Sequence, residues 1–424
     1  MKQAVIDNQV EPFNNKLNRL DALLALRGFA CLMVIVGHCG ITRGSITYKG
    51  YDLTWILVSS GEVAVWIFFA LSGYLMGKVF YSGRYSLNSD GVINFFRNRV
   101  LRIFPLYYYS TLILALFFNP EILKIEHWGI ILRTLTFTYN YSIPGGGVNL
   151  VLWSLSIEIQ FYLCVPFIYA YFKSHLLNRR QIILAFICIT LVAFLLRFAV
   201  WIAFYDQIHE QELYLVKYWY APLLMNFDIF LYGFLVNAWF NVEKLTPPNQ
   251  RVFKPIKLLK SLKYNHKLFA IILVFCLYLF TAHHYYFQEL RGLPRPISGV
   301  RTSTTFFILQ PLTAIVTSYF IFAFESGAYQ DFRKNEKLSF EATLRNPSRI
   351  LEIPGNLSYG LYVWHMPILN KIYTVFTSTI PVEAFVASLT ATLILSTLLS
   401  VVTYYTIELP AARWKTYRRT ETEK

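Results

Sequence analysis

Two ionisable side chains, Arg27 and His38, lie within one apolar stretch of the sequence, residues 20–40 (LDALLALRGFACLMVIVGHCG). Eleven residues make about three turns of an α-helix, so both side chains are expected on one stripe, roughly 16 Å apart along the axis. Ionisable residues are costly inside a membrane and commonly mark functional sites, and histidine is the most frequent general base. The stripe therefore predicts chemistry at two depths of a bilayer rather than a passive anchor.

Three arginines precede the third apolar run of the sequence, in the segment FFRNRVLRIFPLYYY. Arg99 and Arg102 are one helical turn apart and are therefore expected to be neighbours, with Arg97 close by in the sequence. Paired guanidinium groups suit the recognition of phosphate. The alternative is ordinary anchoring of a cytoplasmic basic cluster to anionic lipid.

The composition indicates an integral membrane protein. The chain has 424 residues, of which 55% are hydrophobic and 15% charged, and its mean hydropathy is +0.43. We expect an all-α, polytopic bundle of about ten transmembrane helices, because ten apolar runs approach the length of a span. Residues 128–150 are half apolar and contain Pro144-Gly145-Gly146-Gly147, so they are expected to form a loop, a re-entrant piece or an eleventh span. The ten runs are residues 20–40, 62–81, 104–118, 152–172, 181–204, 218–240, 267–282, 304–324, 356–376 and 382–407.

The distribution of positive charge predicts an orientation. With the N-terminus in the cytoplasm, most of the 39 Lys and Arg residues fall in cytoplasmic segments, as the positive-inside rule requires. Residues 20–410 then form one transmembrane domain between cytoplasmic tails at 1–19 and 411–424. The net charge of +15 lies in short loops rather than on a soluble basic face, which argues against nucleic acid as a partner. The five cysteines have no metal-binding spacing, so we expect no metal site.

This orientation predicts a partner for His38. Arg27 is expected near the cytoplasm and His38 near the outer surface, while Glu158 lies about two turns below that same surface in the run that begins at Trp153. A carboxylate beside a histidine fixes its tautomer and raises its basicity, which suits general-base catalysis. The alternative is a buried pair that only holds two helices together.

Five ordered segments of the chain resemble the signature blocks of the acyltransferase-3 family of integral membrane proteins. They are LRGFACLMVIVGH, FFALSGYL, FFRNRVLRIFPLYY, LWSLSIEIQFYL and LSYGLYVWH, followed by the closing Glu408-x-Pro410. The resemblance covers nearly the whole chain, from about Leu20 to Pro410. It implies about ten transmembrane helices and transfer of an acyl group, usually acetyl from cytoplasmic acetyl-CoA. The acceptors it implies are extracytoplasmic, commonly sugars of surface polysaccharides or lipopolysaccharide, at the plasma membrane, as in the bacterial inner membrane.

The resemblance also implies roles for particular residues. It makes His38 the catalytic histidine, with Arg27 as its partner eleven residues earlier. It assigns Arg99 and Arg102 to the phosphates of CoA, and we expect Arg27 to join them in donor binding. Glu158 matches the acidic residue of the Trp-Ser-Leu block, but Ile159 stands where many members have a second acidic residue. Ser72 and Gly73 form a small pair whose alternative role is close helix packing, and the alternative for His365 is a satisfied histidine beside a proline kink. The further candidate pocket residues are Trp153, Ser154, Ser72, Tyr362 and His365.

The expected activity is O-acyl transfer, with acetyl-CoA as donor substrate and no tightly bound cofactor. The acceptor is expected to be a carbohydrate or glycolipid, and membrane lipid surrounds the chain. Direct transfer, with His38 as base, and transfer through an acyl-histidine intermediate are both open. One alternative from another class is a transporter or flippase for a lipid-linked sugar, but the sequence shows no paired repeats of the kind that transporters often have. A structural membrane subunit is the other, and it leaves the buried Arg27, His38 and Glu158 unexplained.

Overall fold

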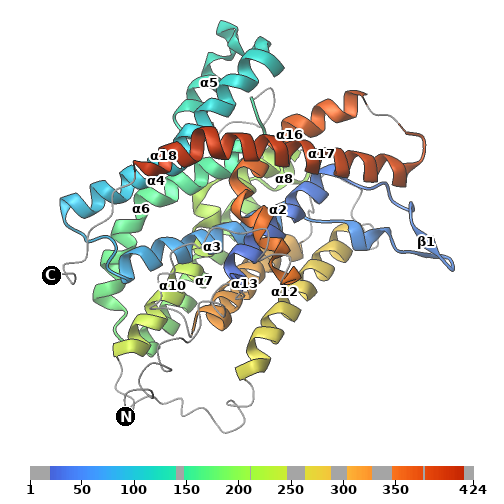
Figure 1. Cartoon of the computed structure of the whole chain (residues 1–424). Coiled ribbons are helices and arrows are strands. Elements are labelled where there is room, and N and C mark those ends of the chain that lie inside the picture. The colour runs from blue at the N-terminus through green and yellow to red at the C-terminus, as the bar shows by residue number, and fades with distance from the viewer. Residues whose placement is uncertain are drawn as a thin grey trace, which may run out of the picture.

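The computed structural model describes residues 20–139, 148–210, 212–245, 263–287, 303–326, 346–375 and 378–414, and these are mainly helical (Figure 1). A short antiparallel hairpin, β1 (Thr47–Tyr48) and β2 (Tyr51–Asp52), follows the first described helix. The helices are α2 (Ala22–Cys39), α3 (Gly61–Tyr81), α4 (Ser89–Ile113), α5 (Trp128–Leu135), α6 (Leu152–His175), α7 (Arg179–Ala203), α8 (Tyr205–Glu210), α9 (Glu212–Leu215), α10 (Leu223–Leu245), α12 (Lys263–Tyr286), α13 (Gln310–Glu325), α15 (Glu352–Asn356), α16 (Ser358–Val375), α17 (Pro381–Thr403) and α18 (Leu409–Arg413).

Nine helical segments of the described ranges are long and apolar enough to cross a membrane. They match nine of the ten runs expected from the sequence, and the remaining run, 356–376, forms α16, an 18-residue helix. α16 is less apolar because it carries His365, which is buried, and Asn370 and Lys371, which are exposed. The predicted all-α membrane bundle is therefore confirmed.

The third span is longer than the sequence indicated. The apolar run was expected to begin at residue 104, after the arginine segment, but α4 already begins at Ser89, where the Asn88 side chain accepts a hydrogen bond from the Gly91 amide at 3.0 Å. Pro105 lies within α4 without ending it. The arginines are therefore on the helix itself, because arginine is a good helix former and its long stem can follow an apolar surface.

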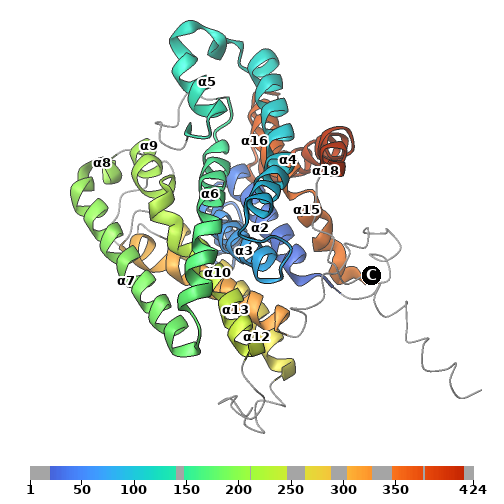
Figure 2. The same cartoon turned by 90° about the vertical axis from the view of Figure 1, so that its left-hand side faces the viewer.

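Residues 128–150 contain α5, whose eight residues are too short to cross a bilayer. The Pro144–Gly147 segment lies outside the described residues, so the choice between a loop and a re-entrant piece stays a prediction. In both views α5 and the end of α4 project from the remaining helices (Figures 1 and 2).

The centre of the bundle is α3, which packs against α2, α6, α10 and α13. α3 and α10 approach most closely at two glycines: a Cβ on Gly73 would lie 2.0 Å from the Phe230 carbonyl oxygen, and one on Gly233 would lie 2.0 Å from that of Ala70. Only glycine permits backbones to come so near. Of the pair Ser72 and Gly73, it is therefore Gly73 that permits the close packing of α3 and α10. The neighbouring Ser72 side chain is available to the site.

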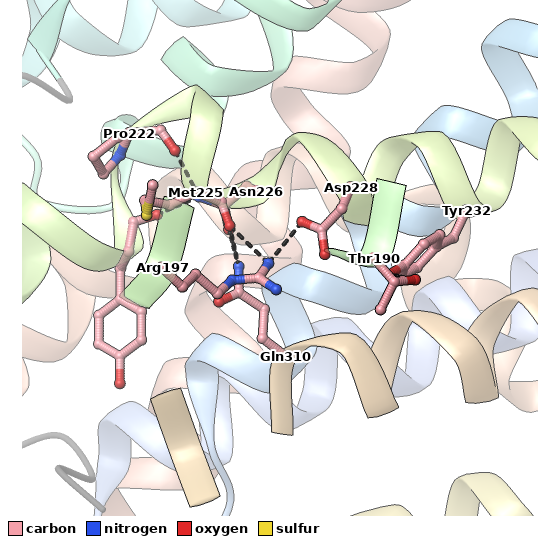
Figure 3. Close-up of polar contacts among 9 residues, drawn as sticks. Thr190, Arg197, Pro222, Met225, Asn226, Asp228, Tyr232 and Gln310 are labelled. Carbon is pink, nitrogen blue, oxygen red and sulfur yellow. Dashed lines mark hydrogen bonds and ion pairs between the residues drawn. The ribbon is translucent and has the colours of Figure 1, made fainter. Parts of the chain in front are cut away.

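A buried polar cluster joins α7, α10 and α13 (Figure 3). Arg197 donates to Asp228 at 2.6 Å and to the Met225 carbonyl at 2.9 Å, and Gln310 donates to the same carbonyl at 2.6 Å. Removing one partner of a buried ion pair commonly costs about 3–5 kcal/mol, because the other charge stays uncompensated. Arg197, a charge in an apolar run, is therefore accounted for by helix packing.

Candidate active site

The first helix holds Arg27 near its beginning and His38 near its end. α2 begins after Asp21, whose carboxylate accepts from the Leu24 amide at 3.0 Å, and it ends before Gly40, which has a positive φ of 52°. A Cβ on Gly28 would lie 1.9 Å from the Leu351 carbonyl oxygen, so the absence of a side chain lets α2 lie close to the segment before α16. The predicted stripe is thus part of the bundle interior.

Most of the predicted site residues line one cavity of about 140 Å³ among α2, α3, α4, α6 and α16. We name it the donor cavity after the role that we propose for it, the binding of an acyl donor. It brings together Arg27, Ser72, Arg99, Arg102, Ser154, Glu158 and Tyr362, and it also includes Tyr162, Ser358 and Tyr359. Side chains from five helices, separated by up to about 330 positions in the sequence, therefore meet as the sequence signals suggested.

The donor cavity has an excess of positive charge. Arg27 donates to the Ser358 hydroxyl at 3.3 Å, and Arg102 forms an ion pair with Glu408 at 3.2 Å. Arg99 makes no hydrogen bond or ion pair within the described part of the chain, and its Nε is buried. Three guanidinium groups thus face two carboxylates, those of Glu158 and Glu408, which is an arrangement suited to an anionic ligand.

Glu158 is held in the donor cavity by two hydroxyl groups. Ser72 donates to its Oε1 at 2.7 Å and Tyr162 donates to the same oxygen at 2.5 Å. Tyr162 lies four residues after Glu158, so the two face the same way on α6. The position of Tyr162 could have been found from that spacing, although the sequence alone did not single it out.

A second, larger cavity of about 500 Å³ contains His38. This histidine cavity, as we call it, is also lined by Trp153 and by Tyr362, which is shared with the donor cavity. Val65 is shared as well, so Val65 and Tyr362 form the wall between the two. The other polar and aromatic side chains around it are Arg43, Ser59, Glu62, Tyr220, Tyr285 and Tyr286.

His38 contacts another histidine. Its Nδ1 lies 2.9 Å from Nε2 of His365, and the two rings stack with centroids 5.0 Å apart. Nδ1 of His365 lies 3.1 Å from the Leu361 carbonyl oxygen. Because a carbonyl only accepts, His365 must carry its proton on Nδ1, and a neutral His365 must then accept at Nε2 from Nδ1–H of His38. A neutral His38 is left with an unprotonated Nε2.

The predicted pairing of His38 with Glu158 is wrong. The two residues line different cavities, and the partner of the His38 ring is His365. The sequence placed His38 and Glu158 at a similar depth, but depth does not fix the direction in which a side chain points.

The remaining predicted residues are divided between the two cavities. Ser154 lies 2.6 Å from the Tyr362 hydroxyl, and this contact ties α6 to α16 at the wall. Trp153 lines the histidine cavity, whereas Arg97 is exposed and lines neither. His365 is fully buried near Pro367 of α16, and its two ring nitrogens lie against His38 and the Leu361 carbonyl, so the choice between a pocket residue and a satisfied core histidine stays a prediction. In the described ranges, no three His, Cys, Asp or Glu side chains gather as metal ligands would.

A model of the acyltransferase domain family matches residues 20–405. The chain belongs to this acyltransferase family. The match confirms the resemblance seen in the signature blocks and, with the nine apolar helices, identifies a multi-pass membrane protein. No solved structure matches the chain.

Several curated proteins are similar to this acyltransferase. The peptidoglycan O-acetyltransferase OatA of Listeria monocytogenes is 26% identical over 358 residues, which cover 79% of this chain and 49% of that protein. The putative peptidoglycan O-acetyltransferase YrhL of Bacillus subtilis is 24% identical over 365 residues, or 82% of this chain and 48% of that protein. The chain spans about half the length of these relatives.

Proposed function

We propose that this acyltransferase moves an acetyl group from cytoplasmic acetyl-CoA to a hydroxyl of an extracytoplasmic glycan. The observation that carries the proposal is the hydrogen bond between His38 and His365, which leaves a basic nitrogen in a large cavity beside an arginine-lined one. Its relatives are named as O-acetyltransferases, two of them for peptidoglycan. These names favour an acetyl group and a cell-wall glycan over other acyl groups and acceptors.

The donor cavity is suited to the phosphates of CoA. Arg99 is the strongest candidate because its guanidinium makes no hydrogen bond or ion pair within the described residues and lies only against the Phe95 and Tyr162 rings, and Arg102 lies one turn away on α4. Arg27 adds a third positive charge from α2. We assign the phosphates to Arg99 and Arg102, with Arg27 bracing the donor from the opposite wall.

His38 is suited to the role of general base. Once it takes a proton on Nε2, the resulting cation still donates from Nδ1 to His365, whose own proton is held by the Leu361 carbonyl. The chain of hydrogen bonds therefore keeps the imidazole in one orientation and one tautomer throughout the reaction. His365 is a positioning residue in this account, since it acts through His38.

The proposed reaction is direct transfer. The acceptor hydroxyl gives its proton to Nε2 of His38 while its oxygen attacks the thioester carbonyl carbon. The tetrahedral intermediate then collapses with cleavage of the C–S bond, and the CoA thiolate takes the proton from His38. The products are an acetyl ester and CoA. In the alternative route, Nε2 attacks the thioester first and an acetyl-histidine passes the group to the acceptor.

The length of α2 agrees with a donor site at the arginines and a base at His38. Arg27 and His38 are about 16 Å apart along the helix, a span of the order of an extended pantetheine arm. The pantetheine arm would run from one cavity to the other alongside Val65 and Tyr362, the two residues that line both cavities. In the plasma membrane, with both termini cytoplasmic, the arginines would face the cytoplasmic donor and His38 the acceptor outside.

A transporter or flippase for a lipid-linked sugar is the rival function. The arginines would then bind a lipid phosphate, but an oriented pair of histidines with a free basic nitrogen would have no purpose. The two functions differ in whether a covalent bond is made.

The proposal predicts that the purified full chain, in proteoliposomes, transfers radiolabelled acetyl from acetyl-CoA to N-acetylglucosamine oligosaccharides. The label should be released as acetate by mild alkali, because an O-acetyl ester is cleaved under conditions that leave the acetamido group intact. Movement of a lipid-linked sugar across the vesicle without any esterification would contradict the proposal and favour the rival.

A further inference from the structure

The beginning of α3 forms one edge of the histidine cavity. Gly61 and Glu62, the first two residues of the helix, line this cavity together with His38. We propose that this edge binds the acceptor: Glu62 holds one hydroxyl of a sugar ring so that a neighbouring hydroxyl reaches Nε2 of His38. This inference rests on the proposed function and adds to it the residue that positions the acceptor.

Gly61 keeps the approach to His38 open. A Cβ built on Gly61 would lie 3.8 Å from Nε2 of His38 and would meet no other atom within 4 Å. Unlike Gly73, Gly61 is therefore not required by a close approach of two backbones. Gly61 therefore lies beside the basic nitrogen at the edge of the cavity, and the residue after Gly61 carries a carboxylate.

The carboxylate of Glu62 can accept further hydrogen bonds. Its Oε2 accepts from the Ser60 hydroxyl at 3.0 Å, and it makes no ion pair with any residue in the described ranges. An ionised carboxylate offers about four acceptor sites and no donor, so most of them are open to donors in the cavity. Sugar hydroxyls are such donors, and a bond from a hydroxyl to a carboxylate is among the stronger kinds.

The remainder of the histidine cavity suits a sugar ring. Trp153, Tyr220 and Tyr286 line it along with Glu62, so aromatic surface lies beside polar groups. Clefts of this kind bind ligands through apolar contact, while a few polar groups fix the orientation. We place two hydroxyls of one sugar ring on Glu62 and His38, because both side chains line this cavity next to Gly61.

A purely structural role for Glu62 makes a different prediction. An acidic residue in the first turn stabilises a helix through its dipole and its capping contacts. If that were its only role, removing its charge would lower the stability of the protein and affect both substrates alike.

Glu62→Gln separates these roles, because glutamine keeps the shape and the Ser60 contact but loses the charge. Glu383→Gln is the matched control: Glu383 lies in the first turn of α17 and accepts from Ser378 at 3.4 Å, but it lines neither cavity. The probe acceptor is the pentamer of N-acetylglucosamine, and the readouts are KM for each substrate, kcat and the unfolding temperature of the full chain in detergent.

We expect Glu62→Gln to raise KM for the pentamer about tenfold or more, with KM for acetyl-CoA and the unfolding temperature unchanged and Glu383→Gln like the native protein. Unchanged kinetics in Glu62→Gln would overturn the inference. So would a lowered unfolding temperature with equal effects on both substrates. If the native protein fails to acetylate the pentamer, the proposed function fails with it, and that result is distinct because no variant is involved.

Discussion

His38→Ala is expected to lower acetyl transfer at least about a hundredfold, because general-base catalysis contributes about 10²- to 10⁴-fold. The loss should appear in kcat, since the phosphates of acetyl-CoA are assigned to arginines on the other side of the wall formed by Val65 and Tyr362. Binding of acetyl-CoA to the variant, measured by equilibrium dialysis with labelled donor, should stay near the native level. The assay is transfer of labelled acetyl by the purified chain.

The control for this variant is His127→Ala, because His127 lies before α5 and lines neither cavity. It should transfer acetyl at the native rate. If His38→Ala retains native kcat while folding normally, His38 is not the base and the assignment fails. A stable adduct of labelled acetyl on His38, isolated from the native protein before acceptor is added, would favour the acetyl-histidine route instead of direct transfer.

Replacing both Arg99 and Arg102 by alanine is expected to weaken acetyl-CoA binding by about a hundredfold or more. A hydrogen bond to a charged group contributes about 1.5–3 kcal/mol, and about 1.4 kcal/mol corresponds to a factor of ten in affinity. Arg99 should carry the larger share, because Arg102 is already partly neutralised by Glu408 at 3.2 Å. The measurement is the Kd for acetyl-CoA of the purified double variant.

The matched control is the double replacement of Arg179 and Arg180, which begin α7 and line neither cavity. It removes the same number of charges from another part of the surface. Equal losses of affinity in the two double variants would mean that general basic character, rather than a phosphate site on α4, attracts the donor.

Much of the fold could be predicted from the sequence because helix length and apolar composition are local properties. Each of the ten apolar runs is helical, and the residues of the signature blocks converge on two adjoining cavities. The beginning of α4 was missed because its arginine segment is not apolar. The residues around these arginines, such as Phe95, Asn98 and Ile103, are buried in the bundle, and hydropathy averaged over the segment does not register this packing.

The partner of His38 could not be predicted for a different reason. His38 and His365 are 327 positions apart, and no periodicity links two helices of a bundle. The chemistry and depth of Glu158 favour it over His365 as the partner of His38 when only the sequence is known. In the structure, α6 is oriented so that Glu158 points toward Ser72 and away from His38. Glu62 is not among the residues predicted from the sequence, because an acidic residue at the beginning of an apolar run usually lies in the solvated first turn of a helix.

The central claim is that one substrate extends from the arginines to His38. The most direct measurement is an experimental structure of the full chain with a non-hydrolysable acetyl-CoA analogue. The account predicts phosphates bound by Arg99 and Arg102, the arm passing Tyr362, and the acetyl group within reach of Nε2 of His38. An analogue bound elsewhere, or one whose acetyl group lies in the donor cavity away from His38, would contradict it.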